Sequence, residues 1–173
     1  MIGVTLFNSC KNAVITNEDK LTGTENKILQ QKDGTISLNV DKADCYSDMT
    51  NPSSNTAEWN VVVSKSGRFD VWLSSATKDT TNLQYKNSVR LNVHDYRLEA
   101  HPVCDKIILN SGDVIYPYFR ADSFMGSLYI QDTGLYNIQV ISEKILPKGY
   151  ENNKSAVTEN SKLLSVFFTP ITR

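Results

Sequence analysis

Short segments of this chain alternate hydrophobic and polar residues with a period of two, the pattern of β-strands with one buried face. In the run 57–63, Trp59, Val61 and Val63 share one face, and the run 68–73 repeats this arrangement. Further alternating or apolar runs occupy residues 36–40, 88–94, 106–109, 127–130, 134–140 and 163–168. No segment keeps an apolar period of 3.6 residues, so we expect only minor helix.

Turn residues between the runs predict how the strands connect. A glycine-containing turn at 64–67 separates the first two runs, so we predict a β-hairpin there. A similar turn at 131–134 predicts a second hairpin. The two return strands, 67–73 and 134–140, share the order Gly, any residue, aromatic, Asp or Asn, β-branched, any residue, aliphatic.

We expect the inward faces of these strands to form one core. Several short strands joined by frequent turns predict an all-β sandwich or barrel. Residues 41–56 are rich in Asp, Asn, Ser and Pro and are predicted to form an irregular surface loop. The predicted core residues are Trp59, Val61, Phe69, Val71, Leu91, Tyr136, Ile138 and Phe168.

Composition and charge exclude several classes of protein. The chain is 40% hydrophobic and 21% charged with a formal net charge of −1, which indicates a globular domain rather than a disordered one. Lysines are scattered among acidic and polar residues, so we do not expect nucleic-acid binding. No apolar run approaches the roughly 20 residues that span a bilayer.

The N-terminus resembles the end of a bacterial lipoprotein signal. A short apolar stretch up to Leu6 is followed by Ser9 and Cys10, and in that family the cysteine is lipidated. The basic segment is missing and the apolar stretch is short, which fits a start codon placed too late or a truncated sequence. The alternative is a plain N-terminal strand with an incidental cysteine.

This reading divides the chain into a signal-like segment at 1–9, a polar tether at 10–32 and a β-sandwich domain at 33–173. It implies a location outside the cytoplasm, in the cell envelope, lipid-anchored or secreted, with membrane contact only through Cys10. In such a compartment Cys45 and Cys104 either pair or remain separate buried thiols, and the sequence leaves both alternatives open.

The strand motifs resemble galactose-binding-like jelly rolls, namely family-six and family-thirty-five carbohydrate-binding modules and glycosidase accessory domains. The resemblance rests on residues 57–63, 67–73, 126–140 and 163–170. It implies a jelly-roll β-sandwich that binds glycans without catalysis. Many such modules hold a structural calcium, but no clear motif for it is present, so we predict no cofactor and leave a metal site undetermined. The acidic residues nearest to that role are Asp41, Asp44 and Asp48, which are only loosely placed.

No group of residues predicts a catalytic site, so we do not expect an enzyme. His94 and His101 lack a metal-ligand partner at the usual spacing. Most carboxylates lie in predicted turns, as Asp33, Asp113 and Asp132 do. In turns the Asp side chain commonly accepts hydrogen bonds from nearby backbone N–H groups. Glycoside hydrolysis would need two carboxylates across a cleft.

Sugar binding needs exposed aromatic faces beside planar polar side chains. Tyr118, Arg120 and Asp122 alternate, so on an extended backbone they project from one side. The alternative is that Arg120 and Asp122 merely pair at the surface. Tyr46 and Tyr85 in polar loops are further candidates. Trp72 is another, because it points away from the core face; the alternative is that the tether or another strand covers it.

The sequence therefore predicts a noncatalytic carbohydrate-binding or accessory domain of a bacterial surface lipoprotein. The alternative function is a structural or protein-interaction β-sandwich that docks a protein partner. The expected partner is a glycan or a surface protein.

Overall fold

The computed structural model describes residues 26–146 and 160–172. The described chain is built almost entirely of β-strands, with two short 3-10 helices, η2 (Val40–Lys42) and η3 (Pro52–Ser54). The strands are β1 (Lys27–Leu29), β2 (Ile36–Asn39), β3 (Asp44–Tyr46), β4 (Thr56–Val63), β5 (Gly67–Thr77), β6 (Val89–Val93), β7 (Tyr96–Ala100), β8 (Lys106–Ile108), β9 (Phe119–Ile130), β10 (Gly134–Ile141) and β11 (Ser161–Pro170).

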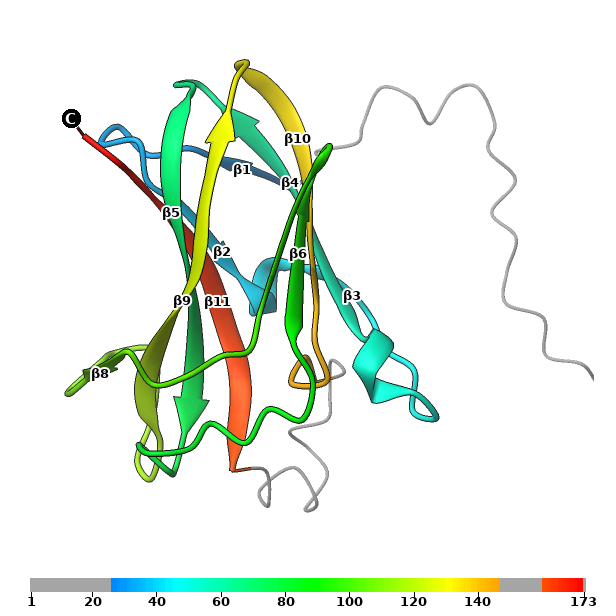
Figure 1. The fold of residues 1–173 in the computed structure, drawn as a ribbon, viewed down its shortest axis with the longest axis vertical. Coiled ribbons are helices and arrows are strands. Elements are labelled where there is room, and N and C mark those ends of the chain that lie inside the picture. The colour runs from blue at the N-terminus through cyan, green and yellow to red at the C-terminus, as the bar shows by residue number, and fades with distance from the viewer. Residues whose placement is uncertain (1–25, 147–159, 173) are drawn as a thin grey trace, which may run out of the picture.

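These strands form two facing sheets, so the all-β sandwich predicted from the sequence is confirmed (Figure 1). The six-stranded sheet has the order β1-β4-β10-β6-β7, with β3 also paired to β4. The five-stranded sheet has the order β2-β11-β5-β9-β8. Neighbouring strands are antiparallel except β1, which runs parallel to β4.

The core fills the space between the two sheets with the inward residues of each strand. Seven of the eight predicted core residues are buried, and Phe69 packs edge-to-face on Phe168 with centroids 6.4 Å apart. Tyr136 is the exception, because it lies near the end of β10 and is only half-buried. Its hydroxyl reaches the backbone carbonyl of Asp132 at 2.9 Å, so the ring packs on the core while its polar end stays near solvent.

The two predicted hairpins are wrong, although their strands exist. β4 and β5 lie in different sheets, and so do β9 and β10. Period-two alternation reports which face of a strand is apolar, and a strand in either layer of a sandwich satisfies that pattern. Each turn therefore carries the chain from one sheet to the other instead of joining hydrogen-bonded neighbours.

The two crossings lie beside each other and explain the matched return strands. β4 pairs with β10 and β5 pairs with β9, with Gly134 opposite Val63 and Gly67 opposite Ile130. Both glycines begin a return strand at positive φ, 154° for Gly67 and 145° for Gly134. The shared sequence pattern thus marks two equivalent crossings between the sheets.

The sandwich begins earlier than the predicted boundary at residue 33. β1 adds to the edge of the six-stranded sheet within the range assigned to the tether. The buried side chain of Gln30 donates to the Gly34 carbonyl at 2.7 Å and accepts from the backbone N–H groups of Ser64 and Lys65 at 2.9 and 2.7 Å. These bonds tie the segment before β2 to the turn after β4.

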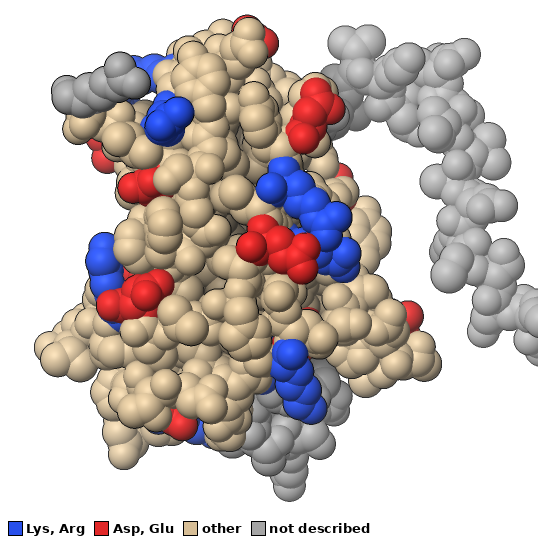
Figure 2. All heavy atoms as spheres, in the orientation of Figure 1, with Lys and Arg blue, Asp and Glu red and all other residues tan. Residues whose placement is uncertain are grey.

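Other predictions concern the cysteines, a membrane span, a metal site and the distribution of charge. Cys10 lies outside the described residues. Cys45 and Cys104 are half-buried and do not form a disulfide with each other. In the part of the chain that the structure describes, no helix is long and apolar enough to cross a membrane, and no cluster of three potential metal ligands occurs. Figure 2 shows basic and acidic side chains interspersed on one face, without a patch of one sign.

Candidate functional site

The outer face of the five-stranded sheet carries a row of aromatic side chains that crosses three strands. Strand register places Phe124 of β9 opposite Trp72 of β5, and Trp72 opposite Phe167 of β11. Beyond Phe167 the row continues to Ser37 of β2. Because alternate residues point to opposite faces, this row lies on the side away from the core residues Leu73 and Phe168.

The next row across the same strands is polar and made of smaller side chains. It runs from Asp122 through Ser74 and Ser165 to Asn39. Serines fill less space than the aromatic rings on one side of them and the long chains of Arg120 and Lys162 on the other. Of this row, Ser165 and Asn39 line a hollow in the sheet surface, whereas Asp122 is buried and bonded to Ser74 and Arg120.

A groove of about 920 Å³ lies over this part of the sheet, and we call it the β2–β11 groove. Its lining is mainly polar and includes two acidic and two basic residues, so its formal charges balance. The lining residues are Gln31, Thr35, Ser37, Asn39, Val40, Asp41, Cys45, Gly112, Asp113, Arg120, Leu146, Lys162, Leu163, Leu164, Ser165 and Phe167.

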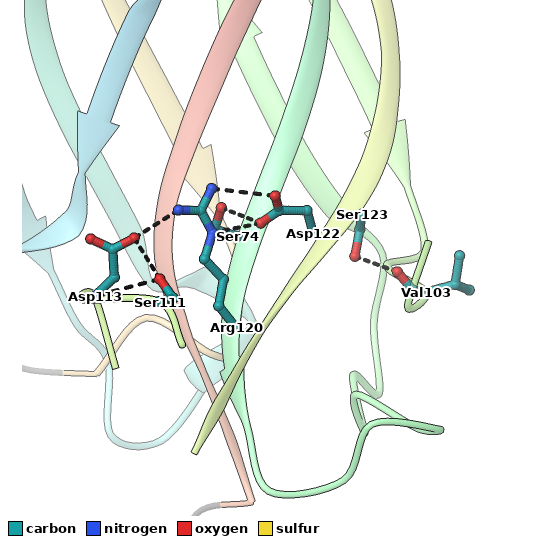
Figure 3. Close-up of polar contacts among 7 residues, drawn as sticks. All are labelled: Ser74, Val103, Ser111, Asp113, Arg120, Asp122 and Ser123. Carbon is teal, nitrogen blue, oxygen red and sulfur yellow. Dashed lines mark hydrogen bonds and ion pairs between the residues drawn. The ribbon is translucent and has the colours of Figure 1, made fainter. Parts of the chain in front are cut away.

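Arg120 is held in the wall of this groove by two carboxylates (Figure 3). Its Nε and Nη2 donate to the two oxygens of Asp122 at 2.8 and 3.3 Å, and its Nη1 donates to Asp113 at 2.7 Å. Asp122 is 4% exposed and also accepts a hydrogen bond from Ser74 at 2.7 Å. The loop between β8 and β9 thereby places Asp113 over the end of β9.

The guanidinium keeps both its charge and part of its hydrogen-bonding capacity. Burial lowers the pKa of Arg120, but the hydrogen bonds and charges of Asp122 and Asp113 outweigh that effect, so the pKa is raised above its usual value. The contacts use three of the five N–H groups of an arginine, which leaves two without a partner among the described residues. Its central carbon lies 5.5 Å from the centroid of the Phe167 ring.

Trp72 is half-buried and connects the groove to the rest of the aromatic row. Its ring is nearly parallel to Phe167, at an interplanar angle of 9° and a centroid distance of 6.4 Å. Phe124 contacts it at 5.2 Å with a tilt of 56°. The Nζ of Lys106 lies 3.8 Å from the centroid of the indole.

The structure brings together only some of the residues predicted for the site. Arg120 and Asp122 project from one side of β9 as expected, but they pair with each other, and the carboxylate is buried beneath the guanidinium. Tyr118 precedes β9, is half-buried and has Lys78 over its ring at 5.1 Å. Trp72 does not line the groove itself, but it packs against Phe167, which does.

Tyr85 and Tyr46 do not join the groove. Tyr85 is 6% exposed and its hydroxyl bonds to Ser75 at 2.8 Å, so the expectation of an exposed ring there is wrong. Burial raises the pKa of Tyr85, as expected of a phenol inside a core. Tyr46 is 63% exposed on β3 of the six-stranded sheet and does not line the groove.

Sequence reasoning missed Phe167 and Asp113. Phe167 and Phe168 are adjacent in one strand, so alternation already requires one of these rings to face outward. The sequence predicts Asp113 in a turn, and within that turn its carboxylate accepts a hydrogen bond from the Ser111 hydroxyl at 3.1 Å. No local pattern reveals that this turn folds back onto Arg120.

The arrangement offers the three elements that recognise a sugar ring. Phe167 supplies an aromatic side chain, Arg120 supplies N–H donors and Asp113 supplies carboxylate oxygens. Neutral hydroxyl groups can donate to a carboxylate and accept from a guanidinium. The balanced formal charge of the lining does not favour an ionic ligand of either sign.

Comparison with known proteins establishes the fold alone. No protein-family model matches the chain, and no curated protein matches it. An α-L-fucosidase from Vibrio sp. strain EJY3 is similar in structure, with a TM-score of 0.64 and 19% identity over 84% of this chain and 24% of that chain. The larvicidal Cry4Aa toxin from Bacillus thuringiensis matches with a TM-score of 0.51 and 12% identity, over 86% of this chain and 25% of that chain.

A third structure is similar in length to this chain. The CBM35 from Cellvibrio japonicus Abf62 matches at 12% identity with a TM-score of 0.41, over 80% of this chain and 94% of that chain. By contrast, this chain spans about a quarter of the length of the fucosidase and of the toxin. The β-sandwich therefore recurs as one part of larger proteins.

Proposed function

We propose that this domain is a noncatalytic carbohydrate-binding or accessory domain that takes a neutral glycan into the β2–β11 groove. The observation that carries the proposal is the position of Arg120. Two carboxylates fix its guanidinium beside the Phe167 ring, and two of its N–H groups have no partner among the described residues.

Preorganisation is the physical reason to place the site there. A free arginine side chain loses rotamer entropy when it binds a ligand, whereas Arg120 is already held by Asp122 and Asp113. Asp113 is also half-exposed, so its carboxylate remains accessible to sugar hydroxyls. A sugar in the groove would meet donors, acceptors and an aromatic ring without large rearrangement of the protein.

The comparisons support an accessory role in carbohydrate metabolism. The part of the Vibrio α-L-fucosidase that this chain resembles makes up 24% of that enzyme. A sandwich of this kind accordingly occurs within a protein that acts on a carbohydrate. In the groove itself Asp113 is engaged by Arg120 and Ser111, an arrangement suited to orienting a ligand rather than to transferring a proton.

A glycan array tests the proposal. We expect the described domain, produced in its full chain, to bind neutral oligosaccharides, and we expect Arg120→Ala and Phe167→Ala to weaken that binding at least about tenfold, as for residues at the centre of a binding site. Lys86→Ala is the control, because Lys86 is exposed and does not line the groove. Silence across the array, or equal binding by all four proteins, would overturn the proposal.

A protein partner is the second candidate function, and one loop favours it. Leu109, Ile115 and Tyr116 between β8 and β9 are 69%, 85% and 87% exposed. Large apolar side chains exposed on one loop are a feature of interaction surfaces. A photo-crosslinking residue at position 116, introduced into the native cells, would yield a discrete protein adduct if a partner docks there, and no adduct if the loop is only a surface feature.

The proposed location is the cell envelope, through a lipid on Cys10. The support is the residue pattern from Leu6 to Cys10 followed by a polar segment. Radiolabelled palmitate should enter the wild-type protein and not Cys10→Ser, and the label should depend on signal processing that globomycin inhibits. A native protein that begins with unmodified Met1 would contradict this location.

A further inference from the structure

Lys106 lies over the indole of Trp72, an aromatic side chain next to the β2–β11 groove. Its Nζ lies 3.8 Å from the centroid of Trp72, within the range of a cation–π contact. Trp72 in turn lies nearly parallel to Phe167, which lines the groove. The covered indole is therefore continuous with the proposed binding surface.

The backbone around Lys106 is fixed although the side chain is exposed. The Ser123 hydroxyl donates to the Val103 carbonyl at 2.6 Å (Figure 3), and the Asp105 carboxylate accepts from the backbone N–H of Phe124 at 2.7 Å. These bonds attach the segment before β8 to β9. The ammonium is consequently placed over the indole by a fixed backbone and a flexible side chain.

The two cations that lie over this aromatic row are held differently. Arg120, over Phe167, is clamped by Asp122 and Asp113. Lys106 takes part in none of the ion pairs found within residues 26–146 and 160–172. Asp122, opposite Lys106 in the strand register, is already engaged by Arg120 and Ser74. Displacing Lys106 therefore breaks a ring contact and no ion pair of the described residues.

The aromatic row is long enough to contact more than one sugar unit. Successive ring centroids are 5.2 Å apart from Phe124 to Trp72 and 6.4 Å apart from Trp72 to Phe167. These intervals are close to the length of one pyranose unit in a linear polysaccharide. A chain lying across the strands would place neighbouring units near neighbouring rings.

We propose that the Trp72 face is a second sugar subsite and that Lys106 is its displaceable cover. The inference rests on the proposed glycan binding at the groove. The ligand class is a neutral, linear oligosaccharide of at least two units, with one unit in the groove beside Phe167 and the next on Trp72. Lys106 competes with the second unit for the indole, and it thereby weakens binding of longer chains without affecting a monosaccharide.

The test compares the binding of oligosaccharides of different length. The probes are β-1,4-linked oligomers of glucose, mannose and xylose with one to three units, titrated by calorimetry into wild type, Lys106→Ala and the control Lys86→Ala. For the di- and trisaccharide of the sugar that wild type binds, we expect Lys106→Ala to bind about two- to fivefold more tightly, the value of an exposed cation–π contact. Monosaccharide binding should be equal in all three proteins.

A second measurement tests the cover without any sugar. The chain has two tryptophans, and Trp59 is 3% exposed, so quenching of fluorescence by acrylamide reports mainly on Trp72. We expect more quenching in Lys106→Ala than in wild type or Lys86→Ala.

The outcomes separate this inference from the proposed function. Glycan binding by wild type with unchanged or weaker affinity of Lys106→Ala for every chain length would overturn the subsite and leave the groove in place. Equal quenching in all three proteins would overturn the cover. Absence of binding to all probes by both wild type and Lys106→Ala would overturn the groove and the subsite together.

Discussion

A single buried carboxylate sets the geometry of the proposed site. Asp122 lies beneath Arg120 and accepts hydrogen bonds from both the guanidinium and Ser74. Asp113 contacts the same guanidinium from the exposed side. The two acids have the same charge and the same partner, so they differ mainly in burial.

This difference predicts unequal costs for two matched substitutions. Asp122→Asn should lower the free energy of unfolding by about 1 to 3 kcal/mol, because it disrupts charge-assisted hydrogen bonds inside the protein. Asp113→Asn should cost no more than about 1 kcal/mol, because its ion pair is solvated. Urea denaturation measures both, and equal midpoints for the two variants would contradict the assignment of Asp122 as the internal support.

Tyr85 gives a pH dependence at the residue scale. Burial raises the pKa of its phenol, while in the unfolded chain the pKa is about 10. A group with a raised folded pKa contributes stability that is fully present below the unfolded pKa and is lost as pH rises above it. Wild type should therefore lose stability above about pH 10 more steeply than Tyr85→Phe.

The same variant should be less stable at neutral pH. Tyr85→Phe leaves the buried Ser75 hydroxyl without its partner, at a cost of about 1 to 3 kcal/mol. Urea midpoints measured from pH 7 to 11 in both proteins give the stability difference at neutral pH and the difference in pH dependence above pH 10. Parallel curves over that range would show that Tyr85 does not resist ionisation in the folded state.

At the scale of elements, the alternating pattern predicted where strands lie but not which strands pair with each other. The run 57–63 became β4 and the run 68–73 became part of β5, yet the turn between them crosses from one sheet to the other. A periodic pattern encodes which face is apolar, while pairing depends on residues distant in the chain. The long strand β9 was missed over its first half because Tyr116 to Asp122 has aromatic, charged and proline residues that resemble a loop.

The glycines at the two crossings have a measurable role. Gly67 and Gly134 adopt positive φ, where a side chain is strained even though their surroundings leave open space. Each Gly→Ala change should cost about 1 to 3 kcal/mol, as for other residues held in a sparsely populated region of positive φ. Gly112→Ala is the control, because that glycine has open space and an ordinary φ, and we expect no loss there. Thermal unfolding distinguishes the sites, and three equal melting temperatures would contradict the strain argument.

At the scale of the whole molecule, one core serves both sheets. Inward residues of β4, β10 and β6 meet inward residues of β5, β9 and β11 in a single cluster. The sequence predicted this core because burial depends on local alternation. It did not predict the groove, because Asp113, Arg120 and Phe167 come together only through tertiary packing.

A shared core predicts cooperative loss of both sheets. Phe69→Ala should cost about 3 to 5 kcal/mol, since Phe69 is 1% exposed and contacts Phe168. Measured in a Trp72→Phe background, far-ultraviolet circular dichroism and the fluorescence of Trp59 should report one transition at the same lowered temperature, although Phe69 and Trp59 belong to different sheets. Tyr129→Ala, at a residue 47% exposed, should shift the transition far less. Separate transitions for the two probes would contradict the single core.

The pairing of β2 with β11 has a consequence for the order of synthesis. β2 lies near the beginning of the described chain and β11 near its end, and the proposed groove needs both. A nascent chain that contains β2 therefore lacks the second wall of the groove until β11 has been synthesised. The five-stranded sheet is completed in a late step, after β11 has left the ribosome. The groove therefore forms only after nearly all of the described strands have been made.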